Sequence, residues 1–423
     1  MFETLKNAWK IEDLRKKILF TLVMLLVYRI GTFIPVPGVD SSYIKAIIEQ
    51  GGLLGFFDII SGGAFGNFTI FAMSITPYIN SSIIMQLLTV AIPKLERLAK
   101  EGEEGRKKIA QYTRYFTVIL AFVQAFGITY GLARNAGALL QNNIWTYLVV
   151  SLTLTAGTAF LMWLGEQITE KGIGNGISLI IFTSIISRAP VAVIQLWNLA
   201  FRAKTINPLY LPLIVVFMIA LIAGVIFIDL GQRRIPVQYS KRVVGRKMYG
   251  GQSTHIPMKV NSSGVLPIIF AVSILAVPQT IAQFMSPESG FVQWVQKWFT
   301  EEKGLYAAIY ALLILFFTYF YTQITFNPVE IADNLKQYGG FVQGIRPGKP
   351  TSDYLLRISN RLTLVGAIFL ALVAILPIAA TAITKVPMAF GGTAILIIVG
   401  VALETSKQLE AQMLMRHYKG FLK

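Results

Sequence analysis

The sequence has 423 residues, of which 54% are hydrophobic and only 14% are charged, with a formal net charge of +17. Soluble proteins carry about 25% charged residues, so this composition excludes a soluble globular enzyme. Cysteine is absent and the two histidines, His255 and His417, lie outside the apolar segments. Disulfides and thiolate metal sites are therefore excluded, and no metal or other cofactor is expected.

Ten uncharged runs predict ten membrane-spanning helices. A spanning helix needs about 20 apolar residues, and the runs are close to this length or longer. The first run is interrupted only by Arg29 and lacks the cleavage site of a signal peptide. In chain order the runs are 18–37, 68–92, 115–133, 135–165, 172–187, 205–228, 260–286, 304–329, 362–384 and 386–403. The sequence therefore predicts an all-α polytopic membrane protein.

Basic residues are distributed unequally between the two sides of these spans. If the N-terminus is cytoplasmic, the segments on its side hold 29 Lys and Arg residues, and the segments on the opposite side hold 8. Cytoplasmic loops are enriched in Lys and Arg. We therefore expect a multi-pass protein of the cell inner (plasma) membrane with both termini in the cytoplasm.

The spans divide into an N-terminal half, 18–197, and a C-terminal half, 205–403, between a cytoplasmic segment, 1–17, and a cytoplasmic tail, 404–423. Because each half contains an odd number of spans, five, the second half crosses the membrane in the opposite direction. The fifth uncharged run is also the shortest of each half. Matched short segments indicate inverted repeats with a site at their interface, although any ten spans can be divided by two.

Between the first two spans, residues 51–68 are apolar and contain six glycines, with Asp58 as the only charged residue. Glycine disfavours a helix, and an additional span would move the basic segment 93–114 to the outside. Irregular backbone at membrane depth is tolerated where it is buried in protein or lines a water-filled cavity. We therefore predict a short re-entrant piece, with an ordinary external loop as the alternative.

Arg29 is the only charged residue within the ten runs, and we expect it to snorkel to the outer face. Ion-coupled carriers usually contain intramembrane ionisable residues, so this class is disfavoured. An uncoupled solute carrier remains an alternative. A membrane-embedded enzyme is a further alternative, but the spans contain no paired Asp, Ser–His pair or zinc-ligand motif.

Two local patterns within the spans are ambiguous. Ile75 and Ile79 are four residues apart and share one helix face, and Ile177 and Ile181 repeat this spacing. Most such pairs in membrane helices face lipid or a neighbouring helix. Residues 172–176, GIGNG, superficially resemble a phosphate-binding loop but lack the full motif and a preceding strand. We expect them to form a tight turn.

Two long basic loops, 231–260 and 328–361, are predicted on the cytoplasmic side. In the second loop, glycines and a proline at 344–348 predict a turn that holds Arg346 outward. Basic loops can be orientation signals or lipid contacts. These loops are longer than orientation requires and contain aromatic residues, which favours a docking surface for a large acidic or nucleic-acid-containing partner.

Short sequence words spread over nearly the whole chain indicate one family. They are IGTFIPVPG at 30–38, ITPYINSSIIMQLLTV at 75–90, EGRKKIAQYTRY at 104–115, FLMWLGEQITEKGIGNGIS at 160–178, GQRRIPV at 231–237, QSTHIPMKVN at 252–261, FNPVEIADNLK at 326–336, GIRPGK at 344–349 and RLTLVGA at 361–367. Together, and in this order around ten spans, these words are specific for one family. The chain resembles the SecY family, the central subunits of bacterial protein-conducting channels.

The resemblance implies two inverted five-helix halves around a central hourglass pore. Its constriction would be a ring of Ile75, Ile79, Ile177, Ile181, Ile269 and Ile397. The family's plug matches the glycine-rich piece at about 55–68, with Gly55, Phe57, Ile60, Ser61, Gly62, Gly63 and Phe65. The family's lateral gate between the second and seventh spans would include Ile83, Gln86 and Ser273, with Gln86 as a polar contact across it.

The resemblance also implies a passive channel for unfolded secretory polypeptides, without catalytic residues of its own. The docking residues for cytosolic partners would be Arg233, Arg234, Lys241, Arg242, Arg346 and Lys349. The implied partners are SecE and SecG in a heterotrimer, the SecA motor ATPase, the ribosome, signal sequences, unfolded preproteins and membrane lipids. Base-specific nucleic-acid binding is not expected.

Overall fold

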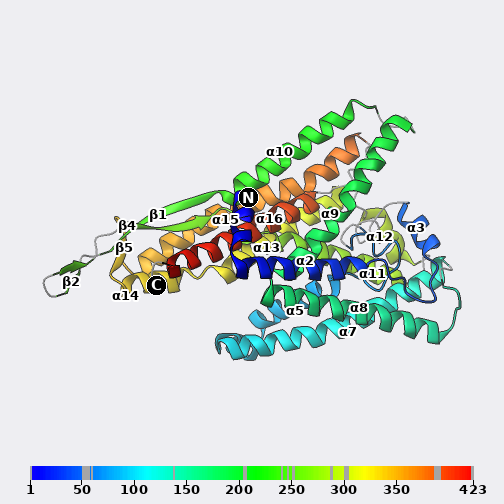
Figure 1. Cartoon of the computed structure of the whole chain (residues 1–423), viewed down its shortest axis with the longest axis horizontal. Helices are drawn as coiled ribbons and strands as arrows, with labels where there is room; N and C mark the ends of the chain where they lie inside the picture. The colour runs from blue at the N-terminus through cyan, green and yellow to red at the C-terminus, as the bar shows by residue number, and fades with distance from the viewer. Residues whose placement is uncertain are drawn as a thin grey trace.

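The computed structural model describes residues 2–49, 58, 61–136, 139–202, 207–239, 242–244, 247–249, 253–285, 289–299, 304–384 and 392–420. Most of these residues are helical. A small β-sheet and α14 (Pro328–Gln337) lie at one end of the molecule, and α3 (Ser41–Glu49) and α12 (Gly290–Trp298) lie at the other (Figure 1).

Ten helices correspond to the ten predicted spans. They are α2 (Glu12–Gly31), α5 (Thr76–Ala91), α7 (Glu103–Ala136), α8 (Ile144–Lys171), α9 (Gly176–Trp197), α10 (Tyr210–Leu230), α11 (Leu266–Phe284), α13 (Gly304–Thr325), α15 (Lys349–Thr384) and α16 (Gly392–Gly420). Within the described residues, seven helices are long and apolar enough to cross a membrane, and α11 contains a shorter apolar stretch. The chain is a multi-pass membrane protein. Besides α3, α12 and α14, the described residues also form the short helices α1 (Phe2–Lys10), α6 (Pro93–Lys100) and η1 (Asn198–Arg202).

The two shortest of these ten helices are α5, with 16 residues, and α11, with 19. They are the second spans of the two halves, whereas the shortest uncharged run of each half is the fifth. Pro77 and Pro267 lie in the first turns of α5 and α11. A helix tolerates proline there because the first-turn N–H groups have no partner within the helix. The run 68–92 therefore overestimates the second helix at its start.

The residues before α5 fold as a chain of turns, 61–75, here called the inner segment. Nearly all of it is buried, including Phe65, Phe68 and Phe71. It is held to the chain after α2 by two backbone hydrogen bonds, from Val36 N to Phe68 O (3.0 Å) and from Ile70 N to Ile34 O (3.0 Å). These contacts fit a re-entrant piece better than an external loop.

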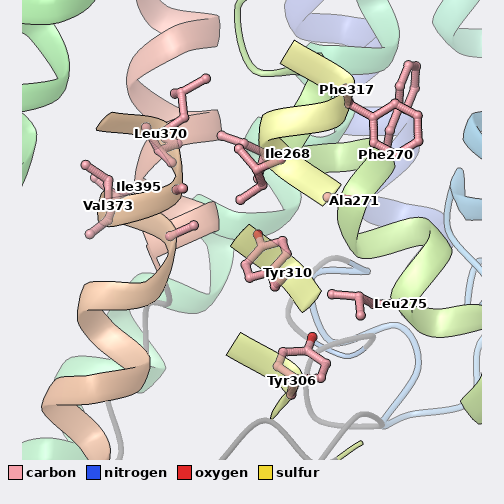
Figure 2. Close-up of a cluster of buried hydrophobic side chains, with 14 of the residues drawn as sticks. Ile268, Phe270, Ala271, Leu275, Tyr306, Tyr310, Phe317, Leu370, Val373 and Ile395 are labelled. Carbon is pink, nitrogen blue, oxygen red and sulfur yellow. The ribbon is translucent and has the colours of Figure 1, made fainter. Parts of the chain in front are cut away.

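One apolar core lies among α11, α13, α15 and α16 (Figure 2). Its aromatic part includes Phe270, whose ring centroid is 5.7 Å from that of Phe317 and 4.9 Å from that of Tyr321. A second core joins α2, α8, α9 and α16 around the inner segment. Ile79 and Ile269 pack against both cores, so the two cores meet at these residues.

A three-stranded antiparallel sheet joins the two predicted loops into one unit. Its order is β4 (Ser253–Lys259), β1 (Gln232–Tyr239) and β5 (Gly340–Val342), with Val237 opposite Val342. A separate hairpin pairs β2 (Arg242–Val244) with β3 (Lys247–Tyr249). We call the sheet, α14 and the start of α15 the sheet body. Its own small core includes Ile235, Val237 and Leu355.

Candidate functional site

The six isoleucines assigned to the ring lie in one region of the interior, here called the ring cluster. They come from the residue before α5 and from α5, α9, α11 and α16, in the order Ile75, Ile79, Ile177, Ile181, Ile269 and Ile397. Ile75, Ile181 and Ile397 are buried members of one apolar core, and the other three pack against it. Four elements that are far apart in the sequence therefore place isoleucine at one point.

A cavity of about 40 Å³ lies at the ring cluster and is lined by Ile79, Ile181, Ile269 and Ile397. Since a water molecule needs a volume of about 10–15 Å³ on this measure, the cavity has room for a few waters at most. A polypeptide cannot pass through it. The arrangement is that of a closed apolar constriction, in which side chains from both halves meet.

The turn between α8 and α9 fixes the start of α9, which carries Ile177 and Ile181 of the ring cluster. The Asn175 side-chain oxygen accepts hydrogen bonds from the N–H groups of Ile177 (3.1 Å) and Ser178 (3.3 Å), and so caps the helix. Gly174 has φ of +82°, which favours glycine. A Cβ atom on Gly176 would lie 2.0 Å from the Gly165 carbonyl oxygen. The GIGNG segment is thus a tight turn, as expected.

The three residues assigned to the lateral gate fall into two groups. Ile83 and Ser273 line an apolar cavity of about 320 Å³ between α5, α7 and α11, whose polar lining includes Asn80 and Gln124. Gln86 does not line this cavity. Its side-chain oxygen instead accepts a hydrogen bond from the hydroxyl of Tyr321 on α13. Gln86 therefore connects the two halves through the eighth span.

The structure describes four of the seven residues assigned to the plug, and all four are buried: Ser61, Gly62, Gly63 and Phe65. Gly55, Phe57 and Ile60 lie outside the described residues. The backbone of the inner segment passes so close to α8 that a Cβ atom on Gly157 would lie 1.9 Å from the Ile70 carbonyl oxygen. The four described residues assigned to the plug thus lie in the interior, and their neighbours Ala64 and Phe71 belong to the same apolar core as the ring cluster.

Charged groups hold this segment in a way that the sequence analysis did not anticipate. Asp58 forms an ion pair with Arg188 on α9. Arg29 was expected to snorkel outward, but its Nη1 donates to the Gly62 carbonyl (3.3 Å) and to Ser187 Oγ (3.0 Å). A lone carboxylate in an apolar segment needs a partner. That rule could have prompted a search for an arginine at the ends of the spans, and Arg188 directly follows the run 172–187.

The residues assigned to docking belong to the basic end of the molecule. Arg233 and Arg234 are exposed on β1, and Arg346 and Lys349 are exposed after β5 and at the start of α15. Arg346 lies between Gly344 and Gly348, whose φ angles are +79° and +93°. Arg242 lies on β2, and Lys241 lies outside the described residues.

No metal-ligand group appears in the described part of the chain, in which no three His, Cys, Asp or Glu side chains lie together. His255 lies on β4 opposite Pro236 of β1, and His417 lies on α16. The described geometry is therefore one of apolar closure, buried charge pairing and a basic surface.

Comparison with a family model and with individual relatives indicates the same family. Residues 69–406 match the sequence model of the SecY family. The chain is 49% identical to the protein translocase subunit SecY of Halalkalibacterium halodurans over 432 residues, and 48% identical to that of Bacillus subtilis over 432 residues. Both alignments cover 100% of this chain and 100% of the relative.

Solved structures share the fold at lower identity. One is a protein-conducting channel, with a TM-score of 0.67, 20% identity, and coverage of 95% of this chain and 93% of that chain. Another is a SecY protein whose plug domain stabilises its closed state, with a TM-score of 0.66, 20% identity, and coverage of 95% and 92%. A third is Sec61 in a canine ribosome–channel complex, with a TM-score of 0.63, 18% identity, and coverage of 95% and 93%.

Proposed function

The chain belongs to the SecY family of protein-conducting channels, and we propose that it passes unfolded secretory polypeptides across the plasma membrane and releases transmembrane segments sideways into the lipid. The family consists of translocation channels and not enzymes. The energy would come from a cytosolic motor or the ribosome. The observation that supports the proposal is that six isoleucines from both halves share one apolar core, and four of them line a closed cavity there.

The ring cluster would act as the seal of the pore. Apolar side chains at a constriction exclude ions because a narrow apolar passage loses its water. Isoleucine side chains also make no sequence-specific hydrogen bonds, so they can close around polypeptides of many sequences. The residues at about 55–68 would form the plug beside this ring, and would leave their place when a polypeptide enters.

The lateral gate would open between α5 and α11. A gate needs two states that differ by only a few kcal/mol, so that a signal sequence can shift the balance. The cavity between α5, α7 and α11 gives this region loose apolar packing, and Asn80 and Gln124 supply polar groups. The Gln86–Tyr321 hydrogen bond would add about 0.6–2 kcal/mol to the closed state, as polar contacts between membrane helices do.

The sheet body would be the docking surface for cytosolic partners. Its exposed arginines are Arg233 and Arg234 on β1 and Arg346 before α15, and the sheet lies at one end of the molecule (Figure 1). The SecA motor and the ribosome are the proposed partners, and one of the similar solved structures is a ribosome–channel complex. SecE and SecG would complete a heterotrimer, with SecE clamping the two halves.

The proposed location is the cell inner membrane, with both termini in the cytoplasm. The excess of basic residues on one side supports this orientation. The sheet body would then face the cytoplasm, and α3 and α12 at the opposite end of the molecule would face outward (Figure 1). The proposed division is into a half spanning 18–197 and a half spanning 205–403.

The test of this proposal is the ion conductance of resting channels in planar bilayers. Replacing Ile79, Ile181 and Ile397 together with Ser should make resting channels leak ions. A matched control replaces three exposed isoleucines of the spanning helices, Ile119, Ile219 and Ile368, with Ser. If both triple variants are as tight as the parent, the ring does not seal the channel. If the parent chain with its partners fails to move a preprotein into vesicles, the proposed function is wrong.

A further inference from the structure

Asp58 occupies a site that is built for a carboxylate. Its side chain is only 8% exposed, and the side chain of its ion-pair partner, Arg188, is 28% exposed. The second carboxylate oxygen of Asp58 accepts a hydrogen bond from the Gly66 N–H (2.6 Å). Its backbone carbonyl accepts from the Gly63 N–H (2.8 Å). Asp58 thus binds the backbone at Gly63 and Gly66 and fixes the piece formed by residues 61–66 to α9.

The same piece is held from a second direction by α2. The hydroxyl of Tyr28 donates to the Ser61 carbonyl (3.1 Å) and lies 2.5 Å from Ser184 Oγ. The next residue, Arg29, binds the Gly62 carbonyl and Ser187 as described above. Ser184, Ser187 and Arg188 lie three and four residues apart, so they share one face of α9. Consecutive residues of α2 and one face of α9 therefore hold residues 61–63 between them.

Two glycines make this close approach possible. Gly62 and Gly63 have φ angles of +65° and +91°. A Cβ atom on Gly63 would lie 2.9 Å from the Arg188 guanidinium carbon, and one on Gly62 would lie 3.0 Å from the Ser184 Cα. The backbone therefore rests directly on the guanidinium group of Arg188, with no side chain between them.

The charges of this site do not cancel, because two arginines face one aspartate. If Asp58 and residues 61–66 left their place, both guanidinium groups would lose their partners in these residues and the like charges would remain. The Asp58 carboxylate would also have to be hydrated again. Charge pairing therefore favours the return of the segment, in contrast to the apolar contacts around it, which a passing polypeptide can replace.

We propose that Asp58, Arg188 and Arg29 are positioning residues that form a charged latch, and that this latch sets how often the plug leaves the resting channel. The inference rests on the proposed function of Asp58 and residues 61–66 as part of a plug. Asp58 and Arg188 carry the main interaction, since they form the buried ion pair. Arg29 contributes less, because its partners here are a neutral carbonyl and a hydroxyl group.

The absence of cysteine from the chain allows a direct measurement. A single Ser61→Cys replacement places a thiol at a position that is 0% exposed. In reconstituted complexes, the rate at which an external membrane-impermeant maleimide modifies this thiol reports how often the segment opens. Mass spectrometry of the intact chain separates this thiol from any cysteine of a partner.

In this background, Asp58→Asn and Arg188→Gln should each raise the labelling rate at least about tenfold, because removing one partner of a buried ion pair leaves the other charge uncompensated. Arg29→Gln should give a smaller rise. The exchanged pair, Asp58→Arg with Arg188→Asp, should label more slowly than Asp58→Arg alone, since both lack the acceptor for the Gly66 N–H and only the pair restores opposite charges. Asp40→Asn, which changes an aspartate in the segment after α2, is the matched control and should leave the rate unchanged.

The latch is wrong if Asp58→Asn and Arg188→Gln label at the rate of the control. It is also wrong if the exchanged pair labels as fast as Asp58→Arg alone, since packing and not charge would then hold the segment. If Asp58→Asn does not accumulate, Arg188→Lys, which keeps the charge but loses the planar fork, should label more slowly than Arg188→Gln. Labelling as fast as Arg188→Gln would then overturn the latch. The proposed channel function is tested separately, by preprotein transport of the parent and by the ion conductance of the isoleucine triple variant.

Discussion

The ring cluster and the sheet body are both built from segments far apart in the sequence, but they differ in what holds them. The ring cluster and inner segment share their packing with α2, α5, α8, α9, α11 and α16. The sheet body has a small core of its own around Val237 and Leu355. A change in the first region is therefore expected to affect closure of the channel, and a change in the second to affect partner binding alone.

This difference also appears in how each region uses charge. In the interior, Asp58 is buried and paired with Arg188, so its contribution depends on geometry. On the sheet body, Arg233, Arg234 and Arg346 are exposed. Exposed charges contribute little to folding but steer a partner of opposite charge over a longer range.

The largest expected effect is on the core of the sheet body. Leu355 is fully buried there, and Leu355→Ala should destabilise the sheet body by about 2–5 kcal/mol, because a buried leucine leaves a cavity when it is truncated. Hydrogen exchange of the β1 and β5 amides should become faster and motor-driven transport should fall. The resting ion conductance should not change. The neighbouring variant Leu356→Ala, at a side chain that is 42% exposed, should leave all three measurements unchanged. A leak in the Leu355→Ala channel would show that the two regions are coupled.

Overpacking the interior should have the next largest effect. Gly157→Ala places a Cβ atom 1.9 Å from the Ile70 carbonyl oxygen, and overpacking of this kind should lower the free energy of unfolding by about 1–3 kcal/mol. Titration with sodium dodecyl sulfate in mixed micelles measures this loss. Gly224→Ala on α10 is the matched control, because its Cβ would meet only the Phe369 ring at 3.7 Å. If the two variants have equal free energies of unfolding, the inner segment moves to accommodate the methyl group without loss of stability.

Removal of one hydrogen bond between the halves should have a smaller effect. Tyr321→Phe deletes the donor to Gln86 and should cost about 0.6–2 kcal/mol. The same titration should detect this loss, and the resting conductance should rise slightly if the bond helps to keep the gate closed. Tyr319→Phe is the control, since the Tyr319 hydroxyl is exposed and makes only a long contact, 3.4 Å, with the Asn360 carbonyl. If the two variants are equally stable, Gln86 does not join the halves.

Hydropathy and the sequence words predicted the family, the helical fold and the approximate place of the ten spans, and the comparisons confirm the family. The uncharged run 68–92 begins before α5, whose start at Thr76 is marked by Pro77. The sheet was missed because Gln232, Arg233 and Arg234 precede the buried Ile235 and Val237, so the strand is too polar to stand out. The pairing of Asp58 with Arg188 has no local spacing that could reveal it, because only the tertiary fold brings these residues together.

The smallest expected effect on folding is at the exposed tip of the sheet body. Arg346→Glu should change the free energy of unfolding by no more than about 0.5 kcal/mol, because exposed substitutions away from special features rarely do more. Partner-driven transport should nevertheless fall strongly, since the reversed charge would repel the acidic partner that the tip is proposed to bind. Transport of a preprotein into reconstituted vesicles, together with the titration above, separates the two quantities. Lys336→Glu reverses another exposed charge, on α14 of the same unit, and should weaken transport less. Equal losses in both variants would indicate attraction by net charge alone, and undiminished transport in Arg346→Glu would remove Arg346 from the docking surface.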